Sequence, residues 1–215
     1  MVLNRDFLCQ KEQTVNSKGK IFYLLGKSAS GKDTVYDRLL QDASLCLKPV
    51  VIYTTRPIRT GEIDGVTYHF RNIPFYKQCE KDIHLIESRV YETMLGPWYY
   101  FTIDDGQIDL EKSSYLMIGT LESYEKMLRY YGSGNMVPLY LEISGAERLQ
   151  RALDREKMQR EPHVDEICRR YLADEKDFSE SNLTVLGIKV RFTNENLEKC
   201  VEEIKAYCSQ FLRGV

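Results

Sequence analysis

The sequence predicts an α/β domain built on a parallel sheet, and two observations carry this prediction. Short apolar segments that suit buried strands alternate with longer segments of helical periodicity, an order typical of parallel sheets with helices on both faces. A glycine-rich stretch, residues 26–34 (GKSASGKDT), lies between the first strand-like segment and the first helix-like segment. With 215 residues and 43% apolar composition, the chain is long enough for one domain with a sizeable core.

Five segments are predicted to form the core sheet, and helices are predicted between them. The predicted strands are residues 21–25, 49–54, 115–119, 137–143 and 189–192. The predicted helices are residues 32–41, 121–131, 146–158, 164–178 and 197–212, the last with its apolar residues on one face. Residues 1–19 form a polar N-terminal extension, and residues 20–215 form the domain, with its core in residues 20–54, 105–144 and 179–215.

Two regions interrupt the regular alternation. Residues 55–104 are rich in turn-forming and aromatic residues and are predicted to form an inserted subdomain. Within it, Asp64-Gly65 is typical of a hairpin turn and predicts a strand over residues 66–70. Residues 145–178 are predicted to contain two helices, which Glu161-Pro162 separates.

Composition limits the classes of partner. Thirty basic and 32 acidic residues give a net charge of −2, so neither nucleic acid nor a membrane surface is an expected partner. No apolar run is long enough to span a membrane, and the N-terminus lacks the apolar block of a signal peptide. The six cysteines contain no C-x-x-C pair, and the three histidines match no zinc-ligand spacing. A cytoplasmic protein with reduced thiols is therefore predicted.

The glycine-rich stretch has the order of a phosphate-binding loop, because a strand precedes it and a helix follows it. Backbone N–H groups and the positive end of the helix then point at one anion. The residues expected to bind ATP are Gly26, Ser28, Ser30, Gly31, Lys32, Asp33 and Thr34. Lys32 is expected to contact the β- and γ-phosphates. Asp33 occupies the position of the usual magnesium-binding hydroxyl and Thr34 lies one place later, so both are candidate Mg²⁺ ligands. The alternative is a plain glycine turn.

A second phosphate site is predicted in residues 54–70 (TTRPIRTGEIDGVTYHF). Arg56 and Arg59 flank Pro57, which restricts the backbone between them. Guanidinium groups form paired hydrogen bonds with phosphate oxygens, and Tyr68 could donate another. The alternative is a pair of solvated surface arginines.

These two stretches together resemble the guanylate kinase family. Residues 54–70 match every fixed position of its signature T-T-R-x-x-R-x-G-E-x-x-G-x-x-Y-x-F. The resemblance implies a P-loop NTPase-type core with a five-stranded parallel sheet flanked by helices, an inserted monophosphate-binding subdomain and a helical lid. It also implies Mg²⁺ and transfer of the γ-phosphoryl group of ATP to GMP.

The resemblance assigns roles to further residues. Residues 85–87 (LIE) resemble the family's F-I-E, which implies that Glu87 binds guanine N1–H and the 2-amino group. Residues 96–102 (GPWYYFT) resemble G-N-Y-Y-G-[ST] with one extra residue, which makes Tyr100 a phosphate ligand and Thr102 a partner of the base. The lid arginines that would stabilise the transferred phosphoryl group are Arg151, Arg155 and Arg170, and Asn194 would lie near the adenine of ATP.

Three departures bear on the acceptor. Ile52 stands where the family often has a guanine-contacting serine, Met117 and Gly119 stand where it commonly has carboxylates, and Asp33 replaces the loop hydroxyl. GMP remains the favoured acceptor. A kinase for ribose 1,5-bisphosphate and a non-catalytic guanylate-kinase-like binding module are the alternatives. Lys32 argues against the module, and the complete signature argues against the bisphosphate kinase. The sequence leaves the oligomeric state open.

Overall fold

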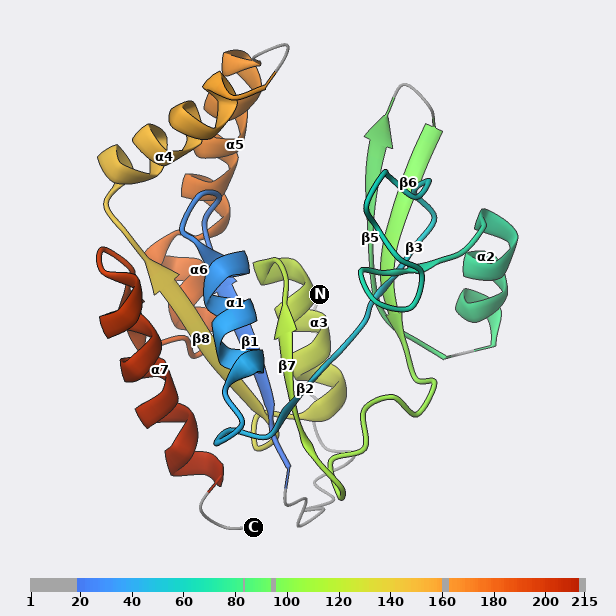
Figure 1. Cartoon of the computed structure of the whole chain (residues 1–215). Helices are drawn as coiled ribbons and strands as arrows, with labels where there is room; N and C mark the ends of the chain where they lie inside the picture. The colour runs from blue at the N-terminus through green and yellow to red at the C-terminus, as the bar shows by residue number, and fades with distance from the viewer. Residues whose placement is uncertain (1–18, 83, 94–95, 160–162, 213–215) are drawn as a thin grey trace, which may run out of the picture.

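The computed structural model describes residues 19–82, 84–93, 96–159 and 163–212. The predictions for the N-terminal extension and for Glu161-Pro162 fall on residues outside these ranges. The described chain contains a core sheet with helices against it, a second sheet beside the core, and two helices, α4 (Gly145–Lys157) and α5 (Val164–Asp177), above one end of the core (Figure 1).

The core sheet has five strands, and all of them are parallel. Their order is β2 (Leu47–Pro49), β7 (Ser114–Ile118), β1 (Ile21–Gly26), β8 (Met136–Glu142) and β9 (Arg191–Thr193). The central strand β1 is buried over its whole length because helices cover both faces. Phe22 and Leu24 belong to one apolar cluster, whereas Tyr23 and Leu25 belong to the other, as the alternation of a strand requires.

Each face of the core sheet has its own pair of covering helices. Side chains of α1 (Lys32–Gln41) and α7 (Leu197–Leu212) join the cluster of Phe22. Side chains of α3 (Leu121–Tyr131) and α6 (Glu180–Val185) join the cluster of Tyr23. The phosphate loop therefore starts from a strand that is fixed on both sides.

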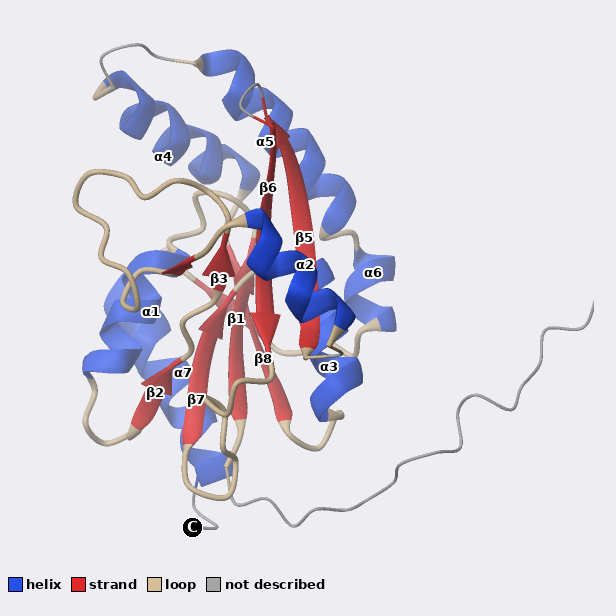
Figure 2. Cartoon of the chain, turned by 90° about the vertical axis from the view of Figure 1, so that its right-hand side faces the viewer, coloured by secondary structure: helices blue, strands red, loops and turns tan. Residues whose placement is uncertain are grey.

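The second sheet consists of β4 (His69–Phe70), β3 (Tyr53–Thr54), β6 (Gly96–Ile103) and β5 (Leu85–Thr93), in this order. The long strands β5 and β6 pair antiparallel, and α2 (Ile73–Lys81) lies beside them (Figure 2). Tyr76 and Cys79 of α2 pack with Tyr53, Phe101 and Ile103 in a separate small core. This sheet carries most of the residues predicted to bind the acceptor.

Most predicted core elements agree with the structure. The helices over residues 32–41, 121–131 and 197–212 have the predicted bounds, α4 begins and ends one residue earlier than predicted, and α5 ends one residue earlier. Strands β1, β7 and β8 also lie within one residue of their predicted bounds, and β9 begins two residues later than predicted. The prediction of a five-stranded parallel sheet flanked by helices is confirmed.

The prediction of a single strand over residues 49–54 is wrong, because these residues belong to two different sheets. Pro49 is the last residue of β2, and Tyr53 begins β3 in the second sheet. Between them, the N–H of Val51 donates to the side-chain oxygen Oε1 of Gln107 at 3.0 Å instead of to a neighbouring strand. The chain thus crosses from one sheet to the other in an extended form that has the same apolar pattern as a strand.

The predicted hairpin at Asp64-Gly65 is also wrong. The N–H of Gly65 bonds to the carbonyl of Tyr68 at 2.8 Å, and Asp64 Oδ1 accepts from the N–H of Phe70 at 2.7 Å. These hydrogen bonds close a compact loop. Of the strand predicted over residues 66–70, only His69 and Phe70 form a strand, β4, which pairs parallel with β3. The sequence analysis also missed α2 and α6, although Asn72 caps α2 through its side chain.

Two further expectations concern membranes and cysteines. None of the helices in the described ranges is both long enough and apolar enough to cross a membrane. The described cysteines are all free: Cys46, Cys79, Cys168, Cys200 and Cys208.

Candidate active site

The phosphate loop joins β1 to α1 and has the backbone that an anion site requires. Gly31 precedes the first turn of α1 with φ 87° and ψ 19° and provides no side-chain cap, so the first N–H groups of α1 remain available to a ligand. Ala29 also has positive φ, 61°, which is uncommon for a residue with a side chain. The loop geometry agrees with the predicted phosphate-binding role.

Replacement of Gly31 by alanine is expected to lower the free energy of unfolding by about 1–2 kcal/mol. A Cβ atom would lie 2.4 Å from Asn194 Nδ2, and the left-handed backbone would be strained as well. Chemical denaturation would measure the change. Gly134→Ala is the matched control, because a Cβ at Gly134 meets nothing within 4 Å. Equal stability of the two variants would contradict the prediction.

Lys32 folds back over the loop. Its Nζ donates to the carbonyls of Gly26 at 2.6 Å and of Lys27 at 3.0 Å. Burial lowers the pKa of Lys32, although the carboxylates of Asp33 and Asp174 act in the opposite direction. An anionic phosphate in the loop would favour the charged ammonium and offer it oxygens in place of the two carbonyls.

Asn194 ties the loop to the end of the core sheet. Its side-chain Nδ2 donates to the carbonyl of Ser30 at 2.8 Å, and its own carbonyl accepts from Arg151 Nη2 at 3.0 Å. The Asn194 side chain therefore positions the loop in this structure, and contact with the adenine of ATP stays a prediction. The hydroxyl of Ser30 is buried and has no hydrogen-bond partner in the described structure.

A buried arginine that the sequence analysis missed joins the loop to both lid helices. Arg148 of α4 is 3% exposed and donates to Asp174 at 3.0 Å, to Glu175 at 2.6 Å and to the carbonyl of Ser28 at 3.1 Å. Asp174 of α5 in turn accepts from the N–H of Ser28 at 2.6 Å, and Glu175 accepts from Lys27 at 2.7 Å. The lid is thereby attached directly to the entrance of the phosphate loop.

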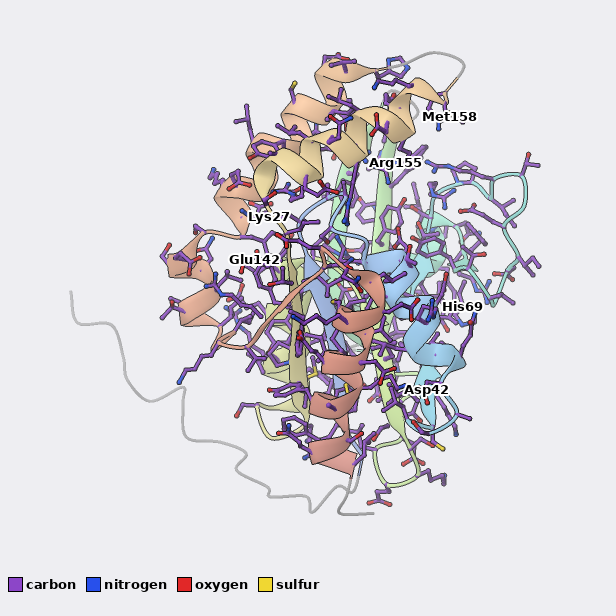
Figure 3. The ribbon with its side chains drawn as sticks, turned by 60° about the vertical axis from the view of Figure 1, so that its left-hand side comes forward. Lys27, Asp42, His69, Glu142, Arg155 and Met158 are labelled. Atoms are coloured by element: carbon purple, nitrogen blue, oxygen red, sulfur yellow. The ribbon has the colours of Figure 1, made fainter. Side chains whose placement is uncertain are left out.

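The lid arginines surround two cavities at this entrance. Arg151 and Arg155 line a cavity of about 240 Å³ together with Lys32, Asp33 and Thr34. Arg155 also lines a larger cavity of about 650 Å³, to which Arg59 and Arg170 contribute. Figure 3 labels Arg155 on the lid helix and Lys27 in the loop beneath it. The larger cavity therefore brings lid arginines and an arginine of the acceptor signature to one space.

The three predicted lid arginines differ in their freedom to bind a ligand. Arg151 pairs with Glu147 at 3.0 Å, and Arg170 pairs with Glu166 at 2.8 Å. Within the described ranges, the guanidinium group of Arg155 makes neither an ion pair nor a hydrogen bond. Arg155 is consequently the lid side chain best placed to bind an anion without breaking a contact.

The predicted acceptor clamp is assembled around Arg56, which is 4% exposed. Its Nη1 and Nη2 donate to Glu62 at 3.0 and 2.6 Å, and its Nε donates to the Tyr100 hydroxyl at 3.1 Å. Tyr68 lies under the guanidinium with its ring centroid 5.5 Å from the central carbon. Arg59 is exposed and uses only its backbone N–H to bind Glu62, at 2.7 Å. The hydrogen bonds to Arg56 lower the pKa of Glu62.

Glu87 is buried on β5 next to Thr102 of β6. Its Oε1 accepts from the Thr102 hydroxyl at 3.0 Å. The structure adds Arg89, whose Nε lies 3.2 Å from Oε2 of Glu87. Burial raises the pKa of Glu87, whereas Arg89 and Thr102 act to lower it. The sequence analysis did not consider Arg89, although residues two apart on a strand share a face.

The end of β7 has no room for a further carboxylate. A Cβ atom at Gly119 would lie 2.2 Å from the Tyr23 hydroxyl and 2.7 Å from Ser123 Oγ. These two oxygens hydrogen-bond to each other at 2.6 Å and occupy the space. Ile52 packs with the cluster of Tyr23 and contributes no hydroxyl. Glu87 is therefore the carboxylate that this part of the site offers to a base.

A magnesium ion would have a limited set of protein ligands. No group of three or more His, Cys, Asp or Glu side chains in the described residues could hold a metal. Mg²⁺ at nucleotide sites usually needs one or two protein oxygens beside phosphates and water. Asp33 and Thr34 line the same cavity as Lys32 and provide such oxygens, so these residues fit the ion.

Comparisons with known proteins agree with this geometry. A family model described as guanylate kinase matches residues 18–102, which include the phosphate loop and most of the second sheet. The guanylate kinase of Zymomonas mobilis is 24% identical over 192 residues, which cover 87% of this chain and 82% of that protein. The crystal structure of guanylate kinase from Anaplasma phagocytophilum aligns with a TM-score of 0.63 and 19% identity over 89% of this chain and 85% of that one. This structural likeness establishes the P-loop NTPase-type fold.

Proposed function

This chain belongs to the guanylate kinase family of phosphotransferases, and from this premise we propose that it transfers the γ-phosphoryl group of ATP to GMP. The observation that carries the proposal is the larger cavity, because it joins Arg59 of the acceptor signature to Arg155 and Arg170 of the lid beside the phosphate loop. Transfer requires the donor and acceptor phosphates to meet in a space that both the lid arginines and the signature arginine can contact.

The proposed reaction breaks the bond between the γ-phosphorus and the β–γ bridging oxygen of ATP, and an oxygen of the GMP phosphate takes its place. The products are ADP and GDP. Such transfer depends mainly on position and on charge stabilisation. The N–H groups of the loop and Lys32 hold the donor phosphates, and Arg155 approaches the transferred group from the lid. Bound Mg²⁺, held by Asp33 and Thr34, would neutralise phosphate charge.

On the acceptor side, Arg59 provides a cation that faces the shared cavity. Arg56 and the hydroxyls of Tyr68 and Tyr100 lie together behind it. The pair of Arg56 with Glu62 holds the guanidinium in a fixed orientation, so a phosphate has to bind beside this carboxylate or displace it. The loop that carries the signature thus presents a cluster of hydrogen-bond donors to one phosphate.

The base end of the site argues against ribose 1,5-bisphosphate as the acceptor. That compound would place a second phosphate near Glu87, where Arg89 is already paired with the carboxylate. The neighbouring cavity of about 580 Å³ is lined by Arg89 and by four carboxylates, Glu122, Glu125, Asp174 and Asp177. Glu122, Glu125 and Asp174 are paired with cations outside the lining, and Arg89 is paired with Glu87, so the cavity has no unpaired cation for a second phosphate and is compatible with a neutral base. A coupled assay of ADP release with GMP, AMP, UMP, CMP and ribose 1,5-bisphosphate tests the proposal directly.

Glu87→Gln is expected to lower the preference for GMP over AMP by about tenfold, since a hydrogen bond to a charged group contributes roughly 1.5–3 kcal/mol. The amide lacks the charge of the carboxylate and carries N–H donors, which cannot accept from guanine N1–H. The quantity to measure is the ratio of kcat/KM for GMP to kcat/KM for AMP. Glu92→Gln, an exposed change on the same strand, is the control. A ratio that Glu87→Gln leaves unchanged would mean that Glu87 does not bind the base.

A further inference from the structure

Arg89 lies beside Glu87 on the same face of β5, and both side chains are buried. The Arg89 side chain is 9% exposed and that of Glu87 is 1% exposed. Besides the 3.2 Å approach of Nε to Oε2, Arg89 Nη2 donates to Glu87 Oε1 at 3.4 Å. The arginine therefore stabilises the ionised carboxylate and brings hydrogen-bond donors to the base end of the acceptor site.

The hydrogen bonds of this pair are incomplete. Glu87 Oε1 accepts from the Thr102 hydroxyl and from Arg89 Nη2, whereas Glu87 Oε2 and Arg89 Nε are buried, lie 3.2 Å apart as an ion pair and make no well-aligned hydrogen bond in the described structure. Arg89 Nη1 makes one long hydrogen bond, to Thr120 Oγ1 at 3.4 Å. Buried polar groups nearly always form well-aligned hydrogen bonds, so a carboxylate oxygen and a guanidinium that meet only in an ion pair and two long hydrogen bonds indicate a site that a further polar group completes.

The surroundings of Arg89 indicate what that group is. Arg89 and Thr120 line the cavity of about 580 Å³, and the other charged residues there are Glu122, Glu125, Asp174 and Asp177. Arg89 is the cation in this lining and is already paired with Glu87, so the cavity offers no unpaired cation to an anion. The guanidinium in turn disfavours a cation beside it. A neutral group with a hydrogen-bond acceptor for Arg89 and a donor for Glu87 meets both conditions.

We propose that Arg89 determines base specificity by donating to the 6-oxo group of a purine while Glu87 Oε2 accepts from the adjacent N1–H. The acceptors would then be 6-oxopurine nucleoside monophosphates as a class, which deepens and rests on the function proposed above. Because Thr102 occupies the other carboxylate oxygen, the 2-amino group contributes little, and IMP is a substrate nearly equal to GMP. Adenine places an amino donor against the guanidinium donors and is rejected.

Four nucleotides test the contribution of the 6-oxo group and that of the 2-amino group independently. GMP has both the 6-oxo and the 2-amino group, IMP has only the 6-oxo group, the monophosphate of 2-aminopurine riboside has only the 2-amino group, and AMP has neither. The expected kcat/KM for IMP lies within about threefold of that for GMP, and the other two fall roughly tenfold or more below, as the loss of one good base contact predicts.

Variants at position 89 test the residue itself. Arg89→Met is expected to lower kcat/KM for GMP and IMP about tenfold each and to leave AMP and the KM of ATP nearly unchanged, so that the base preference is lost. Because Arg89→Met leaves Glu87 buried without its cation, Arg89→Lys is made as well. Lysine keeps the charge but lacks the planar fork, and an intermediate preference is expected. Arg38→Ala, which removes an exposed arginine of α1 paired with Glu198, is the control, because neither residue lines this cavity.

The outcomes distinguish this inference from the function on which it rests. Turnover of GMP with IMP roughly tenfold or more slower would overturn the inference and leave the kinase assignment intact. The same holds if the folded Arg89→Lys and Arg89→Met variants retain the full preference for GMP over AMP. Absence of turnover with GMP and IMP alike, in protein that binds ATP, would overturn both.

Discussion

Replacement of Lys32 by alanine is expected to lower kcat by about 10²–10³-fold, because one preorganised charge contact of this kind contributes roughly 3–4 kcal/mol to the transition state. Lys32 lies against the loop through hydrogen bonds to the carbonyls of Gly26 and Lys27, where the phosphates of ATP would meet it. Single-turnover measurements with saturating ATP and GMP would isolate the chemical step.

The fold should survive this change. The lysine contributes no apolar surface to the clusters around β1, and the loop backbone is held independently by Asn194 and Arg148. Circular dichroism and the Tm verify this point. Lys48→Ala, on the exposed part of β2, is the matched control for loss of a lysine. Retention of near-normal kcat in folded Lys32→Ala protein would remove the lysine from the mechanism.

Arg59→Ala is expected to raise the KM for GMP about 10–100-fold and to change the KM for ATP much less, since hydrogen bonds to charged groups contribute roughly 1.5–3 kcal/mol. Arg59 is a better choice than Arg56 for this test. The Arg56 guanidinium is buried and bonded to Glu62 and Tyr100, so its removal would also disturb the second sheet. Arg59 is exposed and binds Glu62 only through its backbone, which alanine preserves.

Initial rates measured with each substrate varied in turn give the two KM values. Arg38→Ala removes an exposed arginine of α1 that pairs with Glu198, and it provides the control for a change of net charge. Parallel increases in both KM values would assign Arg59 to closure of the shared cavity, since Arg155 and Arg170 line the same space. No change in either value would leave Arg59 without a role in binding.

Local sequence signals determined the parallel core of this protein. Gly26, Gly31 and Lys32 between an apolar strand and an amphipathic helix predict the loop, and both glycines have the positive φ that glycine adopts most readily. The helices over residues 32–41 and 197–212 were equally predictable, since their apolar spacing is set by the single face that each buries. The motif alone predicted Arg56 and Arg59 as acceptor ligands, and the structure places Tyr100 beside Arg56 and Thr102 beside Glu87.

The tertiary structure alone decided which distant groups meet. Residues 49–54 have the pattern of one buried strand, yet Pro49 and Tyr53 belong to different sheets, because an apolar run does not specify its hydrogen-bond partners. The bonds of Arg148 to Ser28 and Asp174 span 120 and 26 residues, and no local spacing encodes them. Arg89 likewise follows Glu87 by two residues, but its burial against Thr120 depends on how the second sheet docks beside β7. Packing of the two sheets and the helices therefore decides which charged groups pair over such distances.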